Sequence, residues 1–208
     1  MDHPLEGVDA KLDRAYRHTK DLETTIEGFL QTALYVAVTE GHFEEGEHIG
    51  YFLIRAREHT EHPVNVIGAA IGDIVHNLRS ALDHLAWQLA ILAGNNPPPE
   101  NTEYPVFKDE AQYRPKNIKL GKPPPPGSGL FKVRGLAADD HALIESLQPY
   151  KTHVINPASA PLWVLHDLAN IDKHRICPVT IPVVSWARLP GRAADRRREA
   201  PHGIRCRG

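Results

Sequence analysis

The fold is decided by the stretch GDIVHNLRSALDHLAW, residues 72–87, which lies inside the longest helical pattern of the sequence. Apolar residues recur through this pattern at alternating steps of three and four: Ile67, Ile71, Ile74, Leu78, Leu82, Leu85, Leu89 and Leu92. At about 100° per residue these side chains fall in one stripe, as in a helix that faces a core. Pro63 before the pattern, and Gly94 and Pro97 after it, predict a helix over residues 64–93.

A second face of this predicted helix carries polar side chains and Trp87. Its members are Asp73, His76, Asn77, Ser80, Asp83, His84 and Trp87, and Arg79 continues the row of His76 and Asp83. The face has no Lys or Glu, which solvated helix faces usually carry. Its residues instead make directional hydrogen bonds or bind metals. Three interpretations stay open: a buried polar network that fixes helix pairing, a catalytic or ligand site, and an ordinary solvated surface.

Composition indicates a soluble globular protein. The chain has 208 residues, of which 41% are hydrophobic and 24% charged, and its net charge of -2 gives no general attraction to nucleic acid or anionic membrane. Cys177 and Cys206 form no CxxC motif, which excludes a disulfide framework and a thiolate zinc site. No apolar run approaches the roughly 20 residues of a membrane span, and the N-terminus does not resemble a signal peptide. We therefore expect a cytoplasmic protein with no membrane partner.

The remaining patterns predict an α+β fold. A helical stripe covers residues 5–32, and β-branched and aromatic runs at 33–57 predict a β-hairpin. Two strands alone are marginally stable, so a third strand is expected at 176–186. The predicted architecture is a helical bundle around residues 64–93 with a small antiparallel sheet.

The domain organisation follows from composition along the chain. Residues 1–187 are predicted to form a single α+β domain, with a Pro-rich connection at 95–136 in extended, exposed geometry. Within that connection, residues 104–107 are expected to pack on the rest of the domain and so hold the first part of the connection in place. Short helices are predicted at 139–147 and 160–175. Residues 188–208 contain seven Arg and no Lys, which is typical of a disordered basic tail, and it is open whether they are a natural C-terminus.

Asp172 lies in the middle of the apolar side of the last predicted helix. A carboxylate in that position is costly unless it is paired. We therefore predict that Asp172 faces the core and bonds a basic or amide group on the central helix, with Arg79 or His76 as the first candidates. In the structural interpretation the polar network comprises Asp73, His76, Asp172, Lys173 and His174.

Three signatures carry a resemblance to known proteins: GDxxHNLRSALDH at 72–84, QPY at 148–150 and NxDKHR at 170–175. Together they resemble a family of uncharacterised bacterial proteins, frequent in actinobacteria, that combine helices with a small sheet. The resemblance spans about residues 5–185. It implies the α+β architecture and no established activity.

Arg79 and His84 also fit the Arg-x4-6-His pattern and so resemble HEPN-domain proteins, which are helical bundles, often dimeric and often metal-independent endoribonucleases. The resemblance implies that His84 handles the proton and Arg79 the phosphate of RNA, with Asn77 and Asp83 in support. Ser80 departs from the family, which usually has Asn, Asp or His there. Arg79 and His84 are about 140° apart on one helix, so they converge only from its two flanks or across a homodimer.

Two further hypotheses compete with the nuclease. A metal-dependent bundle enzyme would use His84 with Asp73 or Asn77, plus His166 or His174. The sequence has no HExxH motif, and a catalytic site normally needs three firm ligands, so no resident metal is assigned. The leading interpretation is a structural or interaction protein whose His, Asp, Asn and Arg side chains form an internal network. It requires no cofactor.

Overall fold

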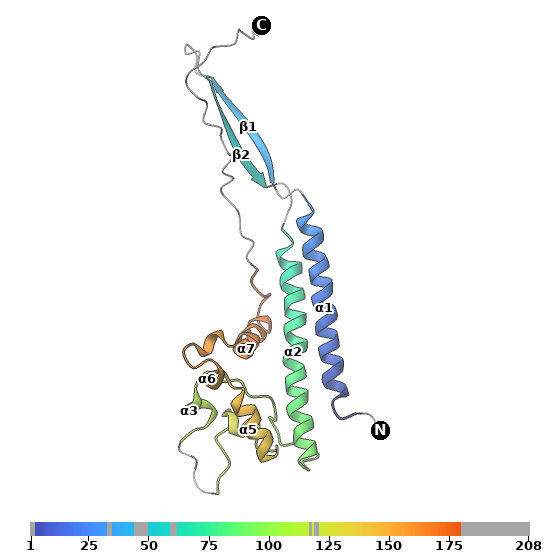
Figure 1. The fold of residues 1–208 in the computed structure, drawn as a ribbon, viewed down its shortest axis with the longest axis vertical. Coiled ribbons are helices and arrows are strands. Elements are labelled where there is room, and N and C mark those ends of the chain that lie inside the picture. Colours follow the sequence, from blue (N-terminus) through green and yellow to red (C-terminus); the bar gives the residue numbers. More distant parts are fainter. Residues whose placement is uncertain are drawn as a thin grey trace.

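The computed structural model describes residues 3–32, 35–43, 50–58, 62–116, 118 and 121–179 (Figure 1). The elements are, in chain order, α1 (Glu6–Leu30), β1 (Tyr35–Phe43), β2 (Gly50–Glu58), α2 (Val64–Leu92), α3 (Glu110–Tyr113), α4 (Gly129–Lys132), α5 (Ala138–Ser146), α6 (Pro149–Thr152), a short 3-10 helix (Pro157–Ser159) and α7 (Pro161–Asp172). None of these helices is long and apolar enough to cross a membrane.

The frame of the molecule is the antiparallel pair of α1 and α2, which lie side by side along most of their length (Figure 1). The prediction of a central helix at 64–93 is confirmed by α2, which begins directly after Pro63 and ends before Gly94. Gly94 has a φ of 93°, a backbone conformation that suits glycine and ends the helix. The predicted first helix is confirmed by α1.

The predicted α+β fold class is wrong, because the body of the protein is built from helices. β1 and β2 pair antiparallel with each other from Tyr35↔Glu58 to Phe43↔Gly50, and no further strand joins them in the described part of the chain. This hairpin extends beyond the end of the α1–α2 pair, away from α3–α7 (Figure 1). Of the expected third strand, residues 176–179 are not a strand, and 180–186 lie outside the described residues.

The Pro-rich connection contributes to the core, contrary to the prediction that it is exposed. Tyr104, Val106 and Val133 are buried together with Ala86 and Ala90 of α2, Leu136, and Ile144 of α5. Tyr113 of α3 is also fully buried. The expectation that residues 104–107 pin the connection to the body is confirmed, because this segment packs between α2 and α5. The predicted tail at 188–208 lies outside the described residues.

Two glycines let residues 172–177 lie against α2. A Cβ on Gly68 would stand 2.6 Å from the carbonyl oxygen of Cys177, and a Cβ on Gly72 would overlap the carboxylate of Asp172. Asp172 therefore faces α2, as predicted. The predicted partner is wrong: among the described residues, neither Arg79 nor His76 donates a hydrogen bond to Asp172. Arg79 is engaged elsewhere on α2, and His76 is exposed.

Candidate functional site

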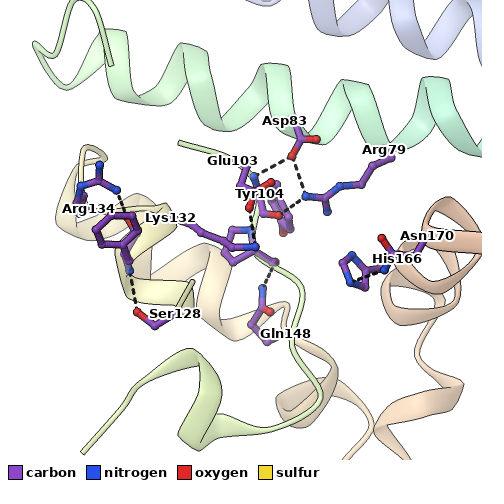
Figure 2. A network of polar contacts seen from close by, with 12 residues as sticks. Arg79, Asp83, Glu103, Tyr104, Ser128, Lys132, Arg134, Gln148, His166 and Asn170 are labelled. Carbon is purple, nitrogen blue, oxygen red and sulfur yellow. Dashed lines mark hydrogen bonds and ion pairs between the residues drawn. The ribbon is translucent and has the colours of Figure 1, made fainter. Parts of the chain in front are cut away.

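Arg79 and Asp83, one turn apart on α2, hold the backbone of Tyr104 (Figure 2). The Arg79 guanidinium lies 2.8 Å from the Asp83 carboxylate and donates a 2.6 Å hydrogen bond to the carbonyl oxygen of Tyr104. The Tyr104 amide in turn donates a 3.0 Å hydrogen bond to Asp83 Oδ1. Both polar groups of one residue's backbone are thus bound by a single ion pair, which we call the backbone clamp.

Gln148 holds the same segment from the other side (Figure 2). Its side chain is fully buried, between α5 and α6. Its Oε1 accepts a 3.0 Å hydrogen bond from the Phe107 amide, and its Nε2 donates to the carbonyl oxygens of Pro105, at 2.9 Å, and Ile144, at 3.1 Å. The signatures at 72–84 and 148–150 therefore meet on residues 104–107, although they are far apart in sequence.

The clamp is only partly accessible to water. The side chain of Arg79 is 12% exposed and that of Asp83 is 36% exposed. Burial raises the pKa of the Asp83 carboxyl above its usual value, and this outweighs the opposing effects of Arg79 and the Tyr104 amide. The pKa of the Tyr104 hydroxyl is also raised by burial. Arg79 thus offsets part of the cost of burying the Asp83 carboxylate.

A polar cavity of about 200 Å³ opens between the clamp and α7. Its lining comes from α2, α4, α7 and the loop before Tyr104: His76, Arg79, Ser80, Asp83, Glu103, Lys132, His166, Ala169, Asn170 and Lys173. Lys132 and Glu103 form an ion pair at 2.6 Å, and Asn170 Nδ2 lies 3.0 Å from His166 Nε2. Burial, followed by the positive charges of Arg79, Lys132 and Lys173, lowers the pKa of His166.

The structure does not bring Arg79 and His84 together. His84 is exposed and lines a different cavity of about 410 Å³ with Asp83, Trp87, Gln88 and Thr102. His84 also faces α1, where a Cβ on Gly7 would stand 3.1 Å from its Nδ1. Asp83 lines both of these cavities, and Arg79 lines the polar one. Within one chain, the two residues of the HEPN-like pattern therefore open to separate spaces.

The other predicted network residues do not form one connected set. Asn77 is buried, but its amide donates to the backbone carbonyl of Asp73 in its own helix, at 2.7 Å. Asp73 and His76 are exposed on α2, as are Lys173 and His174 just after α7. Within the described ranges, no three His, Cys, Asp or Glu residues gather so as to hold a metal ion. The proposed metal set of His84, Asp73 or Asn77, and His166 or His174 is therefore not assembled.

An apolar groove of about 470 Å³ lies between α1, α2 and α7. Among the described residues, its lining is entirely apolar: Val8, Leu12, Leu78, Ala81, Leu82, Leu85, Pro161, Leu162 and Leu165. The sequence pattern placed Leu78, Leu82 and Leu85 in a core-facing stripe, and periodicity alone does not reveal that the groove above them stays open. The Lys132–Glu103 pair was not predicted, and His166 was considered only as a metal ligand.

Comparison of the chain with protein-family models, with curated proteins and with solved structures finds no match. The two resemblances stated from the sequence therefore stay predictions, and function has to be argued from geometry.

Proposed function

We propose that this protein is a non-catalytic interaction protein that self-associates through the apolar groove between α1, α2 and α7. The observation that carries the proposal is the groove itself, a concave surface lined by nine apolar residues from three helices. Exposed apolar surfaces of this kind, when contiguous, mark interaction sites. The polar side chains of α2 serve the fold in this proposal, because Arg79 and Asp83 are bound to each other and to Tyr104.

The occupant that fits best is a second copy of the same chain. Leu12 and Tyr16 stand one turn apart on α1, 45% and 64% exposed, and Leu12 also lines the groove. One chain therefore carries both an apolar ridge and the groove beside it, which is what a two-fold symmetric contact requires. In the described part of the chain, α1 packs on α2 and is otherwise little covered. Two such helix pairs facing each other would form a four-helix arrangement.

Charge does not oppose this association. The net charge of the chain is -2, so two copies repel each other only weakly. The groove lining contains no charged residue that a partner would have to desolvate. Association would thus rest on apolar burial, which scales with the area removed from water.

The test is the substitution Leu12→Glu. We expect the wild-type protein to sediment as a dimer at micromolar concentration, and the variant to dissociate at least about tenfold more readily, because a carboxylate would be desolvated in the contact. Sedimentation velocity over a concentration series measures the effect. The unfolding free energy of the monomer should change by less than about 1 kcal/mol, because Leu12 is already half exposed.

Ile155→Glu is the matched control, since Ile155 is fully exposed in the turn between α6 and the 3-10 helix. It adds the same charge at an equally apolar position outside the groove, and should leave the dimer intact. A wild-type protein that stays monomeric up to its solubility limit would overturn the proposal. So would an equal loss of association in both variants.

The HEPN-like nuclease is the alternative, and it draws less support because Arg79 and His84 line separate cavities. We expect purified protein to leave labelled single-stranded and structured RNA intact in EDTA. Cleavage that occurs in EDTA and disappears in His84→Ala would contradict a non-catalytic function. It would also require the two residues to meet across a dimer, where the chemistry needs both proton transfer and charge stabilisation.

A further inference from the structure

The polar cavity between α2, α4 and α7 contains more hydrogen-bond donors than its own acceptors use. Arg79 is paired with Asp83, and Lys132 with Glu103. The second terminal nitrogen of the guanidinium, Arg79 Nη1, is buried and has no hydrogen-bond partner among the described residues. A buried donor without a partner is costly and therefore calls for an explanation, such as a bound ion.

The charges of the cavity favour an anion. Arg79, Lys132 and Lys173 supply three positive charges, and Asp83 and Glu103 supply two negative ones. Both carboxylates are held by a cation, at 2.8 and 2.6 Å, whereas Lys173 forms no ion pair in the described part of the chain. One positive charge is therefore left over even with both imidazoles neutral. Protonation of His166 would add to it.

From these observations we infer that the polar cavity is a binding site for a compact tetrahedral oxyanion, of which phosphate is the representative. A guanidinium presents a planar set of donors that suits phosphate oxygens, and an ammonium adds a point charge. Ser80 and Asn170 line the same space from α2 and α7 and add polar groups to it. The polar lining thus comes from three separate helices, which suits a ligand that has acceptor oxygens on several sides.

The size of the cavity limits the ligand. Its volume of about 200 Å³ is below the roughly 300–1,000 Å³ of pockets that take drug-sized ligands. A phosphate with a few waters fits, since a water occupies about 30 Å³ in the liquid. The same chemistry would admit either free phosphate or the phosphate of a small organic ester. The inference does not depend on self-association, because the apolar groove shares no lining residue with this cavity.

The test is titration of the full-length protein with inorganic phosphate, and separately with glycerol 3-phosphate, by calorimetry at constant ionic strength. We expect saturable binding, and about tenfold weaker binding to Lys173→Gln, because one charge-assisted contact is lost. Lys122→Gln removes the same charge from an exposed loop position and should bind as the wild type does. Tighter binding of the ester would assign the site to a small organic phosphate, and tighter binding of inorganic phosphate would assign it to the free anion.

His166 supplies a second readout that a purely structural cavity would not give. Its pKa is lowered by burial and by Arg79, Lys132 and Lys173, against Asp167, while Asp83, Glu103 and His76 line the same cavity. A bound anion offsets the three cations, so the pKa of His166 should rise when sulfate is added. Sulfate keeps its charge through this pH range, and NMR titration measures the shift. Absence of binding by both phosphates, equal weakening in Lys122→Gln, or an unmoved His166 would each overturn the inference.

Discussion

Replacing Arg79 with methionine is expected to lower the free energy of unfolding by about 2–3 kcal/mol at neutral pH. Methionine keeps most of the length of the side chain and removes its charge. The Tyr104 carbonyl then loses its donor, and the Asp83 carboxylate loses its cation. Removing one partner of a buried pair costs more than the pair contributes, because the remaining charge stays desolvated. The expected loss is smaller than the roughly 3–5 kcal/mol for breaking a fully buried pair, because the Asp83 side chain is 36% exposed. Urea unfolding measures it.

The loss of unfolding free energy caused by Arg79→Met should be larger at neutral pH than at acidic pH. Burial already raises the pKa of the Asp83 carboxyl above its usual value, and Arg79 opposes that rise. Without Arg79 the folded-state pKa rises further above the unfolded value. The cost of burying the carboxylate is then absent below the unfolded pKa and appears as the pH rises through the folded pKa. The difference from the wild type should therefore be largest at neutral pH and shrink as the pH falls toward 4.

Two variants separate this explanation from a general loss of packing. Arg79→Met combined with Asp83→Asn removes the buried charge, so the pH dependence should disappear and part of the lost stability should return. Arg14→Met, at an exposed position of α1, is the matched control and should change stability by less than about 0.5 kcal/mol. A deficit in Arg79→Met that is independent of pH would contradict the role assigned to Asp83.

The helices were predictable because their signals are local. The apolar period of α2 and the Pro and Gly residues at its ends are all contained within residues 63–97. The β-branched and aromatic runs at 33–57 are equally local, but whether strands form a sheet that covers a core depends on which other segments reach them. No described segment joins β1 and β2, so a local strand pattern led to the wrong fold class.

The sequence correctly located the candidate site on the central helix. It did not predict which groups its side chains would bind. The i, i+4 spacing of Arg79 and Asp83 already permits an ion pair. Their third partner is the backbone of Tyr104, which carries no side-chain signal in the sequence. Asp172 was correctly expected to face α2, but the approach is made possible by Gly72, and Arg79 is already occupied. Arg79 and His84 were expected to point in different directions, because they lie about 140° apart around the helix. In the structure they line separate cavities.

Replacing Gln148 with leucine is expected to have the largest effect on stability of any single change, about 3–5 kcal/mol. Leucine has a similar volume and no polar atom. The Phe107 amide and the Pro105 carbonyl would each lose their hydrogen bond to Gln148, and the Ile144 carbonyl would lose a third. Gln148 is 0% exposed, so water cannot replace these bonds without opening the core. Gln112→Leu, at an exposed position of α3, is the matched control and should be nearly neutral.

The same segment is held by the backbone clamp and by Gln148, so the two changes should not be additive. Once Gln148→Leu releases residues 105–107, the bonds of Arg79 and Asp83 to Tyr104 lose part of their support. The double variant Arg79→Met/Gln148→Leu should therefore lose about 1 kcal/mol less than the sum of the two single losses. Chemical unfolding of the four proteins measures this coupling. Strictly additive losses would mean that the backbone clamp and Gln148 stabilise residues 104–107 independently. That result would contradict the view that the clamp and Gln148 hold this segment as one unit.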